Sequence, residues 1–452
     1  FPPEFEGRDL PAELSFARTA LPFAVALLLL AIVWAQVRNR VRLWLMRTRG
    51  EHLVIAGNGR LARLAALREL REGGGVMVWL QGERPAWTGE ARAGGAATIA
   101  DHRADRSLPL LGLDKARAVL LLTDDDAGNA AEAGDVIEEA ARIRPAGDPL
   151  AVIARIDARE VQSEVEQRAG AVSSTVARVR FASLPDLAAR QLFLDHPLDS
   201  FTWADARQRK VFAFGFTPAI ESYVLRMLAG GHFRDGGKPE FVIVDREAEQ
   251  VAKGFRQHHP GADALTPMRF EYGDIDQPGR IETLYGELIA RYGEPVAVLV
   301  NAADDDLSRA VAGSIDDCYR RSDRPAPLIH ARLESAGVAE PRVMIRHFGS
   351  VEDFADPEIL LQEKHDALAR SIHEFYLEGR LADGDRIGSR ASMQEWEDLP
   401  EGFREDNRLV ADCYQLKLRD IGARLVAGSG PPLRLEPDEL EELSRAEHDR
   451  WM

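Results

Sequence analysis

A succession of short apolar segments occurs twice along this chain of 452 residues. Runs rich in Val, Ile and Leu alternate with helical stretches, which is typical of parallel strands joined by helices. The second set follows the first in order, displaced by 158 residues between Gly57 and Gly215 and by 180 between Asp124 and Asp304. This tandem duplication predicts an α/β fold with strands near 52–56, 76–80, 97–101, 118–126 and 150–155, and again near 211–219, 241–245, 271–274, 296–306 and 328–332.

The first apolar run leads directly into the sequence GNGRLA at 57–62 and then into a helix at 63–71. In this form of the dinucleotide fingerprint, Gly57 makes the tight turn and Gly59 lets the backbone approach a pyrophosphate. The small side chain of Ala62 lets the helix pack closely on the strand, and the phosphate meets the positive end of the helix dipole. The strand–turn–helix context therefore predicts a nucleotide site in the first domain.

The two copies differ at complementary positions of this site. The second strand of the first copy ends in Gln81, where such domains usually present an acid to the ribose hydroxyls. The second copy has the acid, Asp245, but Thr217 replaces the second glycine after Gly215. Because Thr217 narrows backbone access to a phosphate, the second site is expected either to be vestigial or to bind a different nucleotide.

Residues 19–37 carry no charge, and about 20 apolar residues suffice to cross a bilayer core. A buried core helix is the alternative interpretation. Acidic residues precede the run, and five arginines follow it: Arg38, Arg40, Arg42, Arg47 and Arg49. The positive-inside rule then predicts an extracytoplasmic segment at 1–18, a transmembrane helix at 19–37 and a basic linker at 38–50. The expected location is the inner (cytoplasmic) membrane, single-pass, with the remaining domains in the cytoplasm.

The order of these motifs resembles the RCK domain (regulator of potassium conductance, TrkA-N type), well over 51–195 and less well over 209–350. The resemblance implies tandem Rossmann-like domains that bind NAD(H) or ATP/ADP, control potassium or other ion transport, and pair into homodimers or higher homo-oligomers. No TVGYG selectivity filter occurs, so pore segments are expected upstream of Phe1 or in a partner. Fingerprint and resemblance together give the candidate cofactor-binding residues Gly57, Asn58, Gly59, Arg60, Ala62, Gln81, Asp101, Thr123, Asp124, Asp125, Gly215 and Asp245.

The segment 356–452 is predicted to be a small, mainly helical domain. Its words W-x-x-L-P, N-R-x-x-A-D, K-L-x-x-I-G and E-H-x-R-W resemble the RyR domain, the repeat named after ryanodine receptors, over about 365–452. The resemblance implies a ligand pocket. In such a pocket, tryptophans would stack on a nucleobase, and polar side chains at the edges of the pocket would hold a phosphorylated group. The candidate pocket residues are Trp396, Asn407, Arg408, Asp412, His448, Arg450 and Trp451. Alternatively, the tryptophans are core anchors, and Arg408 and Asp412, one helical turn apart, pair with each other.

Charge and composition exclude several other classes of protein. The chain has 57 Lys and Arg against 74 Asp and Glu, a net charge of −17 that opposes binding to nucleic acid. Its two cysteines, Cys318 and Cys413, are far apart and support neither a zinc site nor a disulfide framework. No GxSxG, HExxH or P-loop motif occurs, so no catalytic or metal-binding residues are predicted. The acidic clusters 124–126 and 304–306 are expected to cap helices rather than to bind Mg²⁺ or Ca²⁺.

The resulting prediction is a membrane-anchored sensor, in which a bound nucleotide or small ligand changes domain packing. The main alternative is a membrane-tethered NAD(P)-dependent oxidoreductase. Against it, no proton donor lies beside the fingerprint, and the second half repeats the nucleotide fold instead of supplying a substrate domain. A third alternative is an interaction platform that has lost nucleotide binding.

Overall fold

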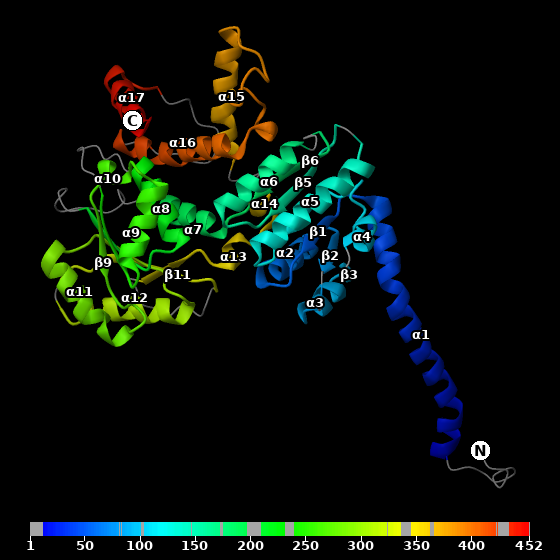
Figure 1. The fold of residues 1–452 in the computed structure, drawn as a ribbon. Helices are drawn as coiled ribbons and strands as arrows, with labels where there is room; N and C mark the ends of the chain where they lie inside the picture. Colours follow the sequence, from blue (N-terminus) through cyan, green and yellow to red (C-terminus); the bar gives the residue numbers. More distant parts are fainter. Residues whose placement is uncertain are drawn as a thin grey trace.

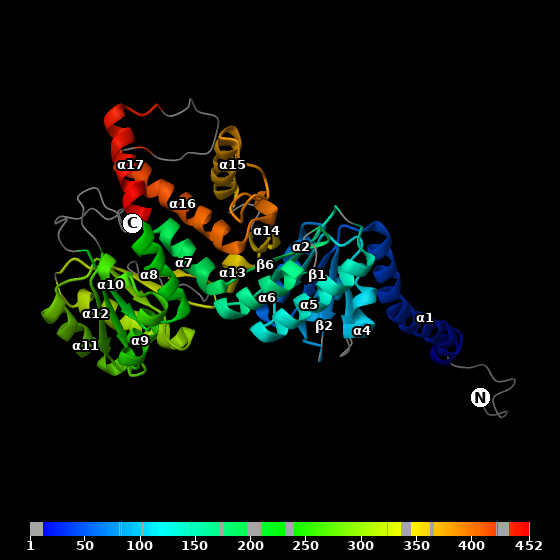
Figure 2. The same ribbon diagram turned by 45° about the horizontal axis from the view of Figure 1, so that its top comes forward.

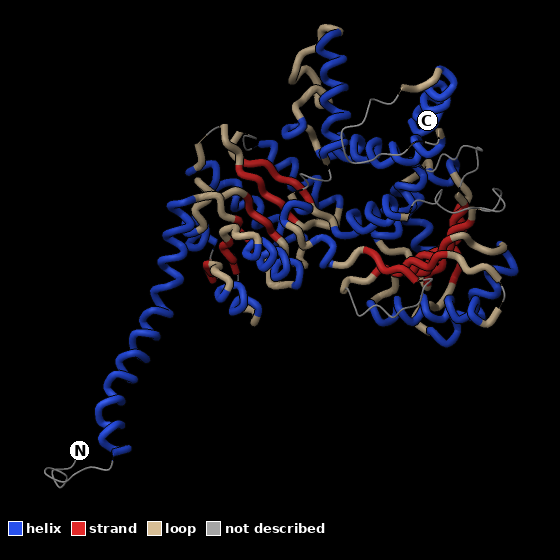
Figure 3. The backbone as a smooth tube through the Cα atoms, turned by 180° about the vertical axis from the view of Figure 1, so that it is seen from behind, coloured by secondary structure: helices blue, strands red, loops and turns tan. Residues whose placement is uncertain are grey.

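The computed structural model describes residues 12–80, 82, 84–100, 104–145, 147–171, 175–196, 209–230, 239–322, 324–335, 345–361, 366–421, 423 and 434–451. Two α/β domains lie beside each other, the long helix α1 projects from the first, and the C-terminal helices lie across both (Figure 1). Seen from behind, the strands form two separate sheets (Figure 3). Both sheets lie within single stretches of the chain, as a tandem duplication requires.

The first sheet has six parallel strands in the order β3-β2-β1-β4-β5-β6. The central strand β1 pairs Leu53 with Val76 of β2 and with Ala118 of β4. The strands are β1 (Leu53–Ala56), β2 (Val76–Leu80), β3 (Ala97–Ala100), β4 (Ala118–Leu121), β5 (Leu150–Ala154) and β6 (Ala177–Phe181). Helices on both faces account for their nearly continuous apolar sequences: α2 (Arg60–Arg71), α3 (Trp87–Ala93), α4 (Ala104–Ser107), η2 (Leu108–Leu110), α5 (Asp126–Ile143), α6 (Arg159–Ala171) and α7 (Leu184–Asp195).

The second sheet repeats this topology, with the order β12-β11-β10-β7-β8-β9. Read from β9, each strand takes the place of its counterpart in the first sheet, which confirms the prediction of two tandem parallel-sheet domains. The strands are β7 (Lys210–Phe214), β8 (Glu240–Asp245), β9 (Met268–Tyr272), β10 (Ala297–Val300), β11 (Leu328–Arg332) and β12 (Ile345–Phe348). The helices are α8 (Pro218–Gly230), α9 (Ala248–His258), α10 (Ala262–Leu265), α11 (Pro278–Tyr292) and α12 (Asp305–Arg320).

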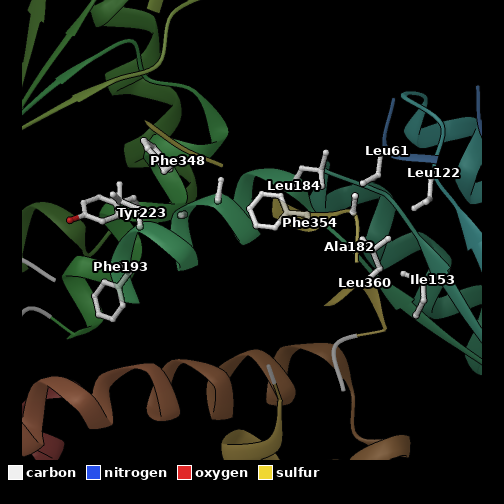
Figure 4. Close-up of a cluster of buried hydrophobic side chains, with 14 of the residues drawn as sticks. Leu61, Leu122, Ile153, Ala182, Leu184, Phe193, Tyr223, Phe348, Phe354 and Leu360 are labelled. Atoms are coloured by element: carbon white, nitrogen blue, oxygen red, sulfur yellow. The ribbon is translucent and has the colours of Figure 1, made fainter. Parts of the chain in front are cut away.

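One hydrophobic core joins the two domains. It runs from Leu53 and Ile55 in the first sheet to Phe241 and Leu299 in the second. The helices α7 and α8 carry it across, and Phe193 and Tyr223 lie along this connection (Figure 4). The opposite face of each sheet has a core of its own. The domains are therefore packed together instead of being connected by a free linker.

Helix α1 (Ala12–Arg49) corrects the predicted membrane topology. Across the part of the chain that the structure describes, no helix is both long enough and apolar enough to span a membrane. The predicted transmembrane helix at 19–37 and the single-pass inner-membrane location are therefore wrong. The apolar run is the middle of a longer helix, and the predicted basic linker continues that helix. There Asn39 exchanges 2.9 Å hydrogen bonds with the backbone of Thr98, and the guanidinium of Arg42 donates to the carbonyl of Arg92 at 2.5 Å.

The remaining helices follow the second sheet. They are α13 (Val351–Phe354), α14 (Pro357–Leu360), α15 (Ala367–Ala382), η4 (Trp396–Asp398), α16 (Glu401–Asp420) and α17 (Pro437–Trp451). Helix α16 packs against α15, α7 and α8, so the C-terminal helices lie over the junction of the two domains (Figure 2).

Candidate functional site

The turn after β1 can be made only by glycine. Gly57 has φ 143°, and a Cβ there would lie 2.8 Å from the carbonyl oxygen of Leu122 and 3.0 Å from the Cβ of Ala62. Any side chain would therefore collide with the start of the loop after β4. The turn lies between β1 and β4, where the order of the strands reverses, and ligands bind at this point in open α/β sheets.

The N-terminus of α2 has no side-chain cap. Its N-cap residue is Gly59, and its first turn contains no acidic residue. By contrast, α5, α7 and α12 are capped by the side chains of Asp125, Ser183 and Asp304. The first N–H groups of α2 are therefore available to an anion, and the helix dipole favours one.

The loop after β4 lies against this turn. Asp124 forms an ion pair with Arg155, and its Oδ2 lies 3.3 Å from where a Cβ on Gly59 would be. Thr123 donates from its hydroxyl to Asn129 Oδ1 at 2.6 Å, and the Asn129 amide donates to the Arg155 carbonyl at 2.6 Å. These bonds hold the carboxylate of Asp124 and the guanidinium of Arg155 beside the open end of α2.

Two aspartates of each acidic cluster accept hydrogen bonds from backbone N–H groups. Asp125 accepts the N–H of Ala127 at 3.1 Å, and Asp304 accepts that of Leu307 at 2.8 Å. Asp126 ties down the loop after β5, and Asp305 ties down the loop after β11 in the same way. Within the described ranges, no group of three His, Cys, Asp or Glu residues is placed to hold a metal ion. The geometry favours the capping interpretation in both domains.

Cationic side chains of both domains border the site. Arg60 extends from α2 to the second domain, where it donates to Ser335 Oγ at 2.6 Å and pairs with Glu352. Arg332 ends β11 with its Nε buried and without a hydrogen bond, and burial lowers its pKa. Neither Arg155 nor Arg332 was among the residues predicted from the sequence. Arg155 directly follows β5, and Arg332 is the last residue of the corresponding strand β11, 177 positions later. This repetition of arginine was the signal in the sequence that could have identified them.

Of the remaining candidate residues of the first domain, the structure describes Asn58 and Ala62. Asn58 is exposed in the turn, where its carbonyl accepts the indole N–H of Trp87 at 3.1 Å, and Ala62 is buried against Gly57. Gln81 and Asp101 lie outside the described residues.

The corresponding turn of the second domain is occupied by its own side chains. Gly215 has φ 87°, and a Cβ there would lie 2.2 Å from the carbonyl oxygen of Asn301. Asp245 accepts the N–H groups of Phe216 at 2.9 Å and Glu247 at 2.8 Å, one with each carboxylate oxygen. Thr217 hydrogen-bonds the Asn301 side chain. Asp245 therefore fastens its own loop, and Thr217 occupies the position of the second glycine.

In the C-terminal helices, the predicted pocket residues have different surroundings. Trp396 is only 3% exposed and packs with Ala369, Leu399 and Ala411, as expected of a core anchor. Asn407 is half-buried and donates from its amide to the Phe403 carbonyl at 2.7 Å. His448 is exposed, and the side chains of Arg450 and Trp451 lie outside the described residues.

Arg408 and Asp412 are buried but do not pair with each other. Arg408 binds Asp366 with two hydrogen bonds of 2.8 Å. Asp412 accepts from Arg190 of α7 at 2.8–3.0 Å and from Arg226 of α8 at 3.1 Å. Asp412 therefore attaches α16 to both domains.

Neither a protein-family model nor a curated protein sequence matches the chain. Among solved structures, the GsuK RCK domain is similar at 14% identity and a TM-score of 0.44, covering 71% of this chain and 78% of that one. The GsuK channel bound to NAD has 13% identity and a TM-score of 0.45, covering 81% and 76% of the respective chains. A dipicolinate synthase structure from Bacillus halodurans has 11% identity and a TM-score of 0.25, covering 69% and 97%. At such TM-scores these likenesses assign no function, and none supports the predicted RyR resemblance.

Proposed function

We propose that the chain binds a nucleotide, NAD(H) or ATP/ADP, at the loop 57–62 and acts as a regulatory sensor rather than as an enzyme. One observation carries the proposal: the uncapped N-terminus of α2 follows the Gly57 turn at the reversal point of the first sheet. Helix N–H groups at that point bind phosphate directly, and the glycines let the backbone approach it.

The contacts of α2 support a regulatory role. Arg60, beside the proposed phosphate position, bonds Ser335 and Glu352 of the second half. Further along the same helix, Arg68 pairs with Asp356 at 2.8 Å, and α2 packs against α13 and α14. A phosphate that draws Arg60 to itself would weaken the contact with Ser335 and Glu352. Ligand binding would then shift the balance between two arrangements of the domains.

The proposed output is control of potassium or other ion transport through a homodimer or a higher homo-oligomer. The order of the sequence motifs supports this output. The fingerprint comes first, followed by the acidic loop after the fourth strand and then by a second domain of the same kind, and this order is what resembles RCK domains. The competing function is an NAD(P)-dependent oxidoreductase, and turnover of a nicotinamide cofactor by the chain would favour it.

Isothermal titration calorimetry with NAD(H), ATP and ADP tests the nucleotide site in the wild type and in Gly59→Asp. The substitution adds a side chain 3.3 Å from Asp124 Oδ2 and a negative charge at the phosphate position. We expect at least a tenfold loss of affinity, equivalent to about 1.4 kcal/mol.

Gly286→Asp is the matched control. It makes the same change on an exposed face of α11, where a Cβ meets no atom within 4 Å, and should leave affinity unchanged. Equal affinity in wild type and Gly59→Asp would refute the assignment of the site.

A further inference from the structure

A cavity of about 610 Å³ lies between the edge of the first sheet and the C-terminal helices. One wall is formed by β5 and β6, with Ala151, Arg178 and Arg180. The other wall is formed by the start of α15 and by η4, with Arg370 and Glu397. The volume is within the usual range of small-molecule sites.

The strand pattern explains why arginines reach this cavity. β6 is the outermost strand, and Arg178 and Arg180, two residues apart, point to the same face of the sheet. In register with them on β5 are Ala151 and Ile153. The small side chain of Ala151 leaves space beside Arg178, and Ile153 belongs to the shared core. The two guanidinium groups therefore lie where the apolar core ends.

The three arginines differ in their partners. Arg370 forms an ion pair of 2.6 Å with Glu397, and Arg178 forms one of 3.1 Å with Asp398. Arg180 donates to the carbonyl oxygen of Leu361 at 3.2 Å and has no carboxylate partner among the described residues. Burial, together with the nearby Arg404, lowers its pKa, while the carboxylates of Asp366, Glu401 and Glu397 oppose the shift. Arg180 therefore has no ion-pair partner of its own among the described residues.

We propose that this cavity binds a phosphate-bearing small molecule, anchored by Arg180 and flanked by Arg178 and Arg370. Guanidinium groups match phosphate oxygens with paired hydrogen bonds. Three of them against the one carboxylate in the lining, Glu397, leave the cavity cationic, which favours a compact polyanion. The site is separate from the loop 57–62 and does not depend on it. Because its walls belong to the first domain and to the C-terminal helices, the ligand would strengthen the attachment between them.

Calorimetry on the full chain with inorganic pyrophosphate tests the proposal. We expect binding to the wild type and at least a tenfold loss of affinity in Arg180→Gln, which removes the guanidinium group and its charge. Arg370→Gln, on the opposite wall, gives a second test if Arg180→Gln folds poorly. Arg168→Gln is the matched control, because Arg168 is exposed on α6 and pairs with Glu164 away from the cavity.

Gly59→Asp separates this site from the nucleotide loop. Pyrophosphate affinity that survives Gly59→Asp and is lost in Arg180→Gln would support the cavity. Affinity lost in Gly59→Asp but retained in both arginine variants would place pyrophosphate at the loop, which overturns this proposal and leaves the proposed function intact. Absence of any binding to the wild type would also overturn it.

Discussion

Gly59 and Thr217 occupy corresponding turns of the two domains: the helix that follows Gly59 has no side-chain cap, whereas Thr217 hydrogen-bonds the Asn301 side chain. The sequence was sufficient to predict that the two turns differ in backbone access, because the presence or absence of a side chain decides this locally. It was not sufficient to predict that Asp245 bonds its own loop. An aspartate after the second strand has the same sequence signature whether it faces a ribose or a backbone N–H.

Glu132 on α5 is expected to make the stability of the chain depend on pH. Burial, with Asp135 and Asp125 nearby, raises the pKa of this carboxyl to about 7, and its Oε2 has no hydrogen-bond partner. The folded state therefore holds a proton that the unfolded state releases near pH 4.5. The free energy of unfolding should fall as pH rises from about 4.5 to about 7 and then level off.

Glu132→Gln should remove this loss and raise the free energy of unfolding at pH 8 by roughly 1–3 kcal/mol. Urea unfolding of both proteins at pH 5 and pH 8 measures the effect. Glu138→Gln, on an exposed position of the same helix, controls for the loss of a negative charge. A wild-type stability that rises between these two pH values, with no difference in Glu132→Gln, would contradict the assignment.

At the scale of elements, the strands and their connecting helices could be predicted because each is encoded by a local apolar pattern. The partners of the charged residues could not be. Asp412 bonds Arg190, 222 positions earlier in the chain, whereas the sequence suggested Arg408, one turn away. An arginine and an aspartate at a spacing of four residues are compatible with a local pair, and only the packing of α16 on α7 and α8 decides against it.

Asp412→Asn should detach α16 from the two domains. The substitution leaves the buried guanidinium groups of Arg190 and Arg226 without their shared carboxylate. Because Arg226 keeps Glu405 at 2.6 Å and Arg190 keeps Asp366 at 3.8 Å, the loss should not exceed about 3–5 kcal/mol, which is typical of a broken buried pair. Chemical denaturation measures the loss. Asp383→Asn, at an exposed position beyond α15, should leave stability within about 0.5 kcal/mol of the wild type. A loss below about 1 kcal/mol in Asp412→Asn would mean that the cluster stabilises little.

For the whole molecule, the duplication predicted two sheets of the same topology, and both are present. The membrane prediction was wrong, because an uncharged run of 19 residues was treated as a separate element although the helix continues to Arg49. The packing of the two domains could not be predicted. It depends on α7 and α8 sharing one hydrophobic core. The apolar residues of a helix do not specify which other helix they pack against.

Arg60→Gln should uncouple nucleotide binding from the second half of the molecule. Since the Arg60 side chain is 48% exposed, its loss should change stability by less than about 1 kcal/mol. Hydrogen exchange of α13 amides, measured with and without the best nucleotide, reports the coupling. We expect a ligand-dependent change in the wild type and none in Arg60→Gln at saturating nucleotide.

Arg63→Gln is the control for this experiment, because Arg63 lies on the same helix but pairs with Glu90 inside the first domain. It should retain the ligand-dependent change. If the α13 amides of Arg60→Gln respond to the nucleotide as those of the wild type do, Arg60 does not couple nucleotide binding to the second half of the molecule.

The core that α7 and α8 share has a consequence for biosynthesis. Domains usually fold as units while the ribosome is still adding residues. Here Phe193 on α7 is buried in the same cluster as Tyr223 on α8, so the first domain leaves part of its apolar surface uncovered until the second has emerged. During that interval the nascent chain exposes an apolar surface that is prone to aggregation. Its correct folding therefore depends on how soon α8 is synthesised.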